Sequence, residues 1–98
     1  MENFTYIVVD WQSYATQTPT RMYHELNEGR FEQRRVEIFR DGTSQWIDSN
    51  CVNGDRMPAL EPLPPIDVIN SYSGFTASEI TMDAFEEVWI RATGDKPA

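Results

Sequence analysis

The chain has 98 residues, 40% of them hydrophobic and 24% charged, a size and composition typical of one globular domain rather than of a disordered or membrane protein. Sixteen acidic residues against eight basic ones give a formal charge of −8, which disfavours nucleic-acid binding because the chain would repel phosphate backbones. No apolar run approaches the roughly 20 residues that cross a bilayer, and the first four residues lack the features of a signal peptide. The single cysteine cannot close an internal disulfide. We therefore expect a cytoplasmic protein.

Four strands are expected in the first half of the chain, at residues 6–11, 20–26, 31–39 and 44–48. The second alternates strictly, with Met22, His24 and Leu26 on one face. In the third, Val36 and Ile38 are expected to point inward, and Arg35 and Glu37 outward. Short connections between consecutive strands predict an antiparallel meander of four strands.

Glycines mark the turns between these strands. Gly29, in Asn27-Glu28-Gly29-Arg30, is expected to supply a positive φ. Asp41-Gly42 is a favoured pair for a two-residue hairpin turn, in which both central residues need a positive φ. This second turn predicts a hairpin and is the strongest local signal in the chain.

Two helices are expected in the second half. Pro65 suits the first position of a short helix over residues 66–72, which Gly74 would end. Thr81 is a good N-cap for a final helix from Met82 to about Ala92, whose apolar stripe would face the sheet. Gly94 would mark the end of this helix. The predicted fold is α+β: a four-stranded antiparallel sheet covered on one face by the C-terminal helix, with the short proline-initiated helix before it. It would form a single domain over residues 1–98, with residues 1–3 and 95–98 frayed.

Residue types that support catalysis or metal binding are sparse. His24 is the only histidine and has no partner at metal-ligand spacing. A nucleophilic pair of Cys51 with His24 is conceivable, but Cys51 lies in a polar segment that nothing places within reach of the imidazole. No glycine-rich phosphate loop is present. We therefore expect a protein that is not an enzyme and that holds no metal or cofactor.

Charge is polarised along the sequence, because no lysine or arginine lies between Arg56 and Arg91. An acidic surface suits a basic protein partner, although such a surface also keeps a small protein soluble. The expected partner-binding residues are the acidic ones of the last third, Asp67, Glu79, Asp83, Glu86 and Glu87.

A small ligand is the alternative to a protein partner. Aromatic rings can stack on a base, and guanidinium groups can bind phosphates. The expected residues for a nucleotide-like ligand are Tyr14, Arg21, Arg35 and Trp46. A second subunit of a homo-oligomer could complete their pocket. Convergence of Arg21 and Arg35 in a pocket beside Trp46 or Tyr14 would favour this alternative. Pairing of the arginines with Glu25 and Glu37 across strands would disfavour it.

Six segments spread over residues 6–92 form a distinctive combination. They are Tyr6-Ile7-x-Val9-x-Trp11, Arg35-Val36-Glu37-Ile38-Phe39-Arg40-Asp41-Gly42, Pro62-Leu63-Pro64, Ile69-Asn70, Phe75-x-Ala77-x-Glu79-Ile80-Thr81 and Phe85-Glu86-x-Val88-Trp89-x-x-Ala92. Together they resemble an uncharacterised bacterial and phage family, the domain of unknown function numbered 6881. The resemblance implies a stand-alone protein of bacterial or phage origin. By analogy with small acidic proteins of that origin, it implies an immunity protein or inhibitor that neutralises a toxin or a defence enzyme, or alternatively a binder that sequesters a nucleotide signal.

Overall fold

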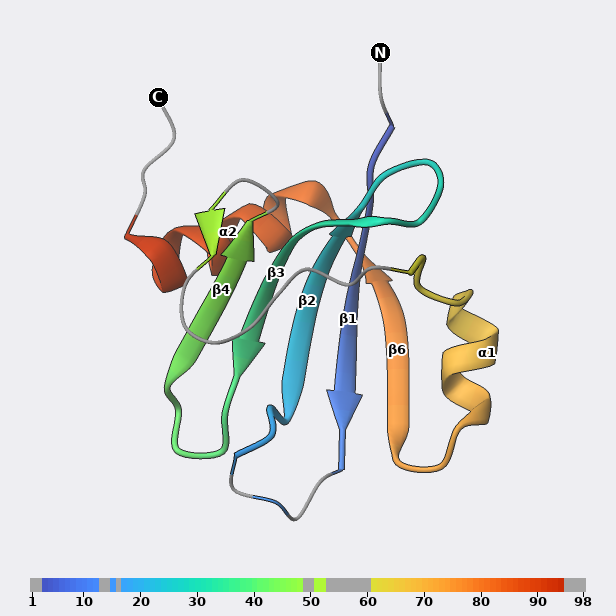
Figure 1. The fold of residues 1–98 in the computed structure, drawn as a ribbon, viewed down its shortest axis with the longest axis horizontal. Coiled ribbons are helices and arrows are strands. Elements are labelled where there is room, and N and C mark those ends of the chain that lie inside the picture. Colours follow the sequence, from blue (N-terminus) through green and yellow to red (C-terminus); the bar gives the residue numbers. More distant parts are fainter. Residues whose placement is uncertain (1–2, 13–14, 16, 49–50, 53–60, 95–98) are drawn as a thin grey trace.

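The computed structural model describes residues 3–12, 15, 17–48, 51–52 and 61–94, which form an antiparallel sheet and two helices (Figure 1). The strands are β1 (Thr5–Trp11), β2 (Arg21–Leu26), β3 (Glu32–Ile38), β4 (Ser44–Asp48), the two-residue β5 (Cys51–Val52) and β6 (Phe75–Ile80); the helices are α1 (Ile66–Ser71) and α2 (Met82–Thr93). None of the described helices is long and apolar enough to cross a membrane.

The first four strands form the predicted meander, in the spatial order β4-β3-β2-β1 with every neighbouring pair antiparallel. The predicted number of strands is wrong, because β6 pairs with β1 and β5 pairs with β4. The sequence of β6, Phe-Thr-Ala-Ser-Glu-Ile, is small or polar at most positions and shows no clear alternation. Pairing with β1, rather than strand propensity, therefore holds β6 in the sheet.

Helix α2 packs on one face of the sheet and lies behind the strands in Figure 1. Its residues Phe85 and Trp89 meet Tyr6 of β1 and Val36 of β3 in a buried cluster. Phe85 is completely buried, and its ring centroid lies 5.2 Å from that of Tyr6. This contact confirms the prediction that the C-terminal helix covers the sheet through its apolar stripe.

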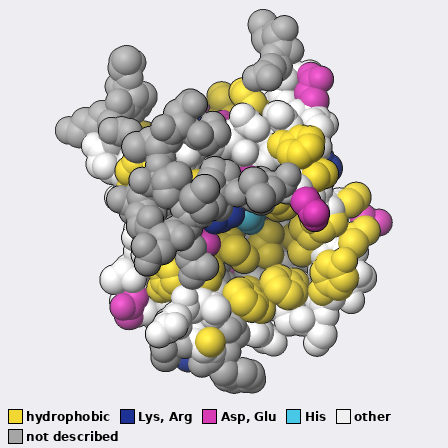
Figure 2. All heavy atoms as spheres, in the orientation of Figure 1, with side chains coloured by type: hydrophobic (Ala, Val, Ile, Leu, Met, Phe, Trp, Pro, Cys, Tyr) yellow, Lys and Arg dark blue, Asp and Glu magenta, His cyan; other side chains and the backbone are white. Residues whose placement is uncertain are grey.

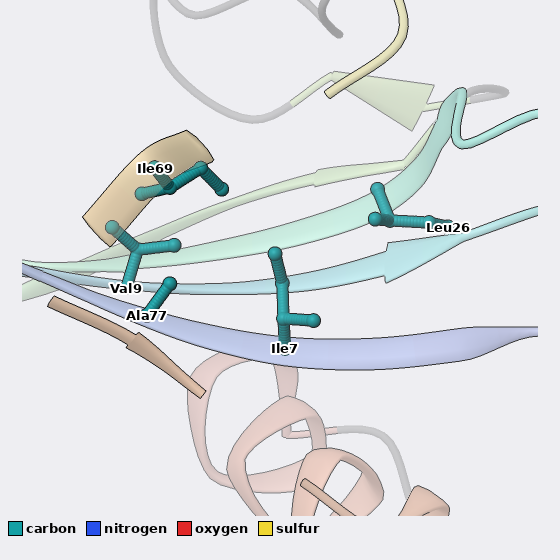
Figure 3. Close-up of a cluster of buried hydrophobic side chains, with 5 residues drawn as sticks. All are labelled: Ile7, Val9, Leu26, Ile69 and Ala77. Carbon is teal, nitrogen blue, oxygen red and sulfur yellow. The ribbon is translucent and has the colours of Figure 1, made fainter. Parts of the chain in front are cut away.

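The opposite face of the sheet has a hydrophobic core of its own, which the prediction of a single covered face missed. Helix α1 lies beside β6, and its Ile69 packs with Val9 and Ala77. Figure 3 shows these residues, with Ile7 and Leu26, on the side of the sheet away from α2. Side chains of successive strand residues thus enter two different cores.

This second core also explains why Arg35 and Glu37 do not face solvent as predicted. Both side chains lie on the face opposite α2, with exposed fractions of 12% for Arg35 and 5% for Glu37. The alternation of β3 was assigned to the correct faces, but the face opposite α2 is buried as well.

Both ends of α2 follow the predicted capping pattern. The Oγ1 of Thr81 accepts a hydrogen bond from the backbone N–H of Ala84 at 3.1 Å, which satisfies one of the free donors at the start of the helix. Gly94 ends the helix in the left-handed conformation, with φ 77°. Pro65 is the N-cap of α1 rather than its first helical residue.

The turn between β3 and β4 contains Gly42 as predicted, but its type differs. Gly42 has a φ of 88°, whereas Asp41 has no positive φ. The N–H of Phe39 donates to the carbonyl of Thr43 and the carbonyl of Phe39 accepts from Gly42, both at 2.9 Å. This is a three-residue loop, a type I turn followed by a left-handed glycine, and the predicted two-residue turn is wrong.

In the turn between β2 and β3, the left-handed residue is Arg30, with φ 66°, and not Gly29. A non-glycine residue in this region costs about 1–2 kcal/mol. The guanidinium of Arg30 offsets that cost by donating to the carbonyls of Leu63 at 2.9 Å and Pro64 at 2.7 Å. Arg30 thereby fixes the segment before α1 to the β2–β3 turn.

Candidate functional site

The sheet face under α2 holds an ion-pair network centred on Arg34. Its guanidinium donates through Nε and Nη2 to the two carboxylate oxygens of Glu25, each at 2.8 Å, and also contacts the carboxylate of Glu86 on α2. The guanidinium carbon lies 4.9 Å from the ring centroids of both Phe85 and Trp89. Because the network joins β2, β3 and α2 within the core, we assign it a structural role.

Tyr6 extends this network from β1. Its hydroxyl donates to Oε2 of Glu25 at 2.9 Å. Burial, together with the hydrogen bond to the Glu25 carboxylate, raises the pKa of Tyr6 to about 12. The phenol is therefore a fixed donor at neutral pH rather than an acid–base group.

The opposite face carries a second polar cluster, formed by His24, Glu32, Arg35 and Glu37. Nδ1 of His24 lies 2.6 Å from Oε2 of Glu32, and Nη1 of Arg35 donates to Oε1 of Glu32 at 2.6 Å. His24, Glu32 and Glu37 are 6%, 4% and 3% exposed. Figure 2 views this face and shows the one histidine with a basic side chain beside it and hydrophobic side chains below it.

This cluster fixes the orientation of the imidazole ring, as carboxylate–histidine pairs do, and it compensates buried charge. The described residues contain no group of three or more His, Cys, Asp or Glu side chains that could hold a metal ion. Cys51 begins β5, which β4 and β3 separate from β2. Neighbouring strands lie about 4.8 Å apart, so the backbones of Cys51 and His24 are roughly 14 Å apart, beyond the reach of a nucleophile–base pair.

A different kind of site lies where the start of β1, the end of β6 and the start of α2 meet, at the upper end of the sheet in Figure 1. Phe4 and Met82 remain 39% and 56% exposed although both are large and apolar. Both line a pocket of about 430 Å³ with Glu79, and Asp83 follows Met82 as an exposed residue. We call Phe4, Glu79, Met82 and Asp83 the Phe4–Met82 surface. Exposed apolar side chains edged by charge are typical of protein-binding surfaces.

Comparison with known proteins agrees with the resemblance seen in the sequence. The family model described as Domain of unknown function (DUF6881) matches residues 5–94. The chain belongs to this family. No curated protein and no solved structure was found to match it.

The structure places the predicted partner-binding residues of this DUF6881 domain on several surfaces. Glu79 and Asp83 belong to the Phe4–Met82 surface, whereas Asp67 is exposed in the first turn of α1. Glu86 contacts Arg34 within the network under α2. Glu87 is exposed and lies 3.8 Å from Arg91. Of the five acidic residues, Glu79 lines the same pocket as Phe4 and Met82, and Asp83 follows Met82 in the sequence.

The two arginines of the nucleotide-binding alternative are not brought together. Arg21 shares its face of the sheet with Tyr23, to whose hydroxyl it donates at 3.4 Å. Arg35 is paired with His24 in the strand register and shares the opposite face with it. Arg21 pairs across strands with Asp10, at 2.6 Å, rather than with Glu25.

The aromatic residues of that alternative do not complete a common site. Trp46 packs edge-on against Trp89 of α2, with ring centroids 5.5 Å apart, and contributes to the core under the helix. Tyr14 lies outside the described residues. Within one chain of this DUF6881 domain, Arg21 and Arg35 therefore lie on opposite faces of the sheet and do not line a common pocket.

Sequence reasoning did not single out Phe4 or Met82. Met82 lies three residues before Phe85 and so continues the apolar stripe of α2, which indicates burial. The pattern contains no information about where the sheet stops covering the helix, and that limit is what leaves Met82 exposed. Phe4 precedes the first predicted strand and belongs to no periodic pattern.

Proposed function

We propose that this domain is a non-enzymatic cytosolic binding protein that neutralises a protein partner with a basic surface, in the manner of an inhibitor or immunity protein. Its partner would be a toxin or a defence enzyme, and the Phe4–Met82 surface would be the binding site. The observation that carries the proposal is the exposure of two large apolar side chains, Phe4 and Met82, that line one pocket together with Glu79, while the exposed Asp83 follows Met82 in the sequence.

Phe4 and Met82 would provide the apolar centre of the interface. Full burial of a large apolar side chain contributes about 1.5–3 kcal/mol, and a few such anchors supply most of the energy of an interface. The pocket of about 430 Å³ between these residues offers space for a side chain of the partner. Binding would remove from water an apolar area that the free domain leaves exposed.

Glu79 and Asp83 would select a basic partner. Both are exposed, and within the described part of the chain neither forms an ion pair, in contrast to Glu86 and Glu87. Their charges therefore remain available to a lysine or arginine of the partner. The formal charge of −8 adds a long-range attraction that speeds association with a positively charged surface.

The test combines capture of the partner with matched charge variants. The tagged full chain is used to capture its partner from the native cell, and association with the purified partner is then followed at low and high salt. We expect Glu79→Lys with Asp83→Lys to slow association roughly tenfold at low salt. Phe4→Ser with Met82→Ser should mainly speed dissociation, because it removes apolar contacts rather than charge.

The matched control is Asp41→Lys with Asp67→Lys, which changes the net charge equally at two exposed positions, one in the β3–β4 turn at the other end of the sheet and one in α1. If both charge-reversed pairs slow association equally, the acidic charge acts generally and the proposed surface is not the binding site. If the serine pair leaves the dissociation rate unchanged, the apolar anchors are refuted. A chain that dimerises through Phe4 and Met82 would show that the surface serves self-association instead.

A further inference from the structure

A second pocket lies at the other end of α2, between this helix and the β3–β4 hairpin, and its volume is about 360 Å³. It is lined by residues of β2, β3, β4, the turn between the last two, and the C-terminal half of α2: Arg21, Tyr23, Ile38, Gly42, Ser44, Val88, Arg91 and Ala92. Two arginines from different elements thus face a space whose other walls are apolar or carry a hydroxyl group. The volume is within the range of small-molecule sites.

Arg21 is held in place before any ligand arrives. Its Nε donates to Oδ1 of Asp10 on the neighbouring strand at 2.6 Å, and its Nη1 donates to the hydroxyl of Tyr23 at 3.4 Å. These contacts occupy two of the five N–H donors of a guanidinium. The hydrogen bond to Asp10 first, and that to Tyr23 second, raise the pKa of Arg21, so the group stays charged. A positioned guanidinium with remaining donors is suited to a planar or tetrahedral oxyanion.

Arg91 can join Arg21 at little cost. Its Nη2 lies 3.8 Å from Oε1 of Glu87, and the two side chains are 77% and 73% exposed. An ion pair this exposed contributes little to stability, because water screens both charges. An oxyanion in the pocket would therefore compete successfully with Glu87 for the guanidinium.

We propose that this pocket binds a small organic oxyanion, a phosphate or carboxylate group on a compact apolar or aromatic body. Arg21 and Arg91 would hold the oxyanion, with the hydroxyl groups of Tyr23 and Ser44 as further donors. The apolar body would rest on Ile38, Val88 and Ala92, which supply a wall that inorganic phosphate alone could not use. Arg91 lies about two and a half helical turns from Met82 along α2, so this site is separate from the Phe4–Met82 surface and does not depend on it.

The experiment is a titration of the isotope-labelled full chain, followed by amide chemical shifts, at low ionic strength. The probes are phenyl phosphate, benzoate and inorganic phosphate, with neutral phenol as the control for apolar binding alone. We expect phenyl phosphate or benzoate to shift the amides of Tyr23, Ser44 and Ala92 and to bind more tightly than either phenol or inorganic phosphate. The stronger of the two aromatic anions identifies the oxyanion.

Variants of α2 separate a specific contact from general charge. Arg91→Gln should weaken the better aromatic anion roughly fivefold. Glu87→Gln should strengthen it, because it removes the carboxylate that pairs with Arg91, whereas Asp83→Asn makes the same charge change away from the pocket and should have less effect. The proposal is overturned if phenol binds as well as the anions, if the shifted amides lie elsewhere, or if Glu87→Gln and Asp83→Asn act equally.

Discussion

Replacing Arg34 with methionine removes the guanidinium from the network under α2 while keeping an unbranched apolar side chain. The carboxylate of Glu25, whose side chain is 9% exposed, then keeps only the hydroxyl of Tyr6 as a partner within this network. Leaving a buried charge without its ion-pair partner costs about 3–5 kcal/mol. The free energy of unfolding of domains of this kind is about 5–15 kcal/mol. Arg34→Met should therefore lose a large part of the stability of the fold.

Urea denaturation followed by tryptophan fluorescence measures this loss, because Trp89 lies against the guanidinium of Arg34. The control is Arg34→Met combined with Glu25→Gln, which removes the buried charge and retains an amide oxygen to accept from Tyr6. We expect the double variant to recover most of the lost free energy of unfolding. Two results would refute the structural role of this network. One is a loss of unfolding free energy below about 1 kcal/mol for Arg34→Met, as expected for a surface ion pair. The other is a double variant that is no more stable than the single variant.

Two further predictions concern Tyr6 and Arg30. The pKa of Tyr6 in the folded domain is about 12, above its ordinary value of 10.0. The stabilisation that its hydroxyl provides is therefore complete below about pH 10 and is lost as the pH rises to about 12. The difference in unfolding free energy between the wild type and Tyr6→Phe should accordingly fall from about 2 kcal/mol at neutral pH toward zero at about pH 12. A difference that stays constant with pH would contradict the hydrogen bond to Glu25. At Arg30, whose φ is 66°, we expect Arg30→Ala to be less stable in urea than Arg30→Gly by about 1 kcal/mol, since only glycine adopts this conformation without strain. The reverse order would show that the turn relaxes when the guanidinium is removed.

Local signals in the sequence predicted the elements that local chemistry determines. Thr81 and Gly94 identified the ends of α2, and the strand of residues 44–48 was predicted with its observed bounds. The alternation of β2 placed His24 on the correct face. These features depend on capping, turn residues and periodicity, all of which lie within a few neighbouring residues.

Tertiary contacts account for the features that sequence reasoning missed. β6 is a strand because β1 offers it a pairing edge, and the side-chain amide of Asn70 covers its other edge by bonding both the N–H and the carbonyl of Ala77. Arg30 adopts a left-handed φ because Leu63 and Pro64, more than 30 residues away, accept its hydrogen bonds. Neither contact leaves a periodic signal in the sequence.

The candidate sites, too, depend on tertiary contacts. Composition groups the acidic residues of the last third, but only the fold separates Glu86, which pairs with Arg34, from Glu79, which lines a pocket with exposed apolar side chains. The pocket that contains Arg21 and Arg91 joins residues 70 positions apart. Its existence depends on how α2 crosses the sheet, which no local pattern encodes.

Hydrogen–deuterium exchange of the domain, alone and bound to its captured partner, tests the proposed binding site most directly. The first N–H groups of α2 have no partners within the helix other than the cap at Thr81, so their exchange reports contact with another molecule. We predict that binding protects residues 3–6 and 79–84, around the Phe4–Met82 surface, and leaves α1 unchanged. Protection confined to α1 or to the β3–β4 hairpin, with residues 79–84 exchanging as in the free domain, would contradict the account.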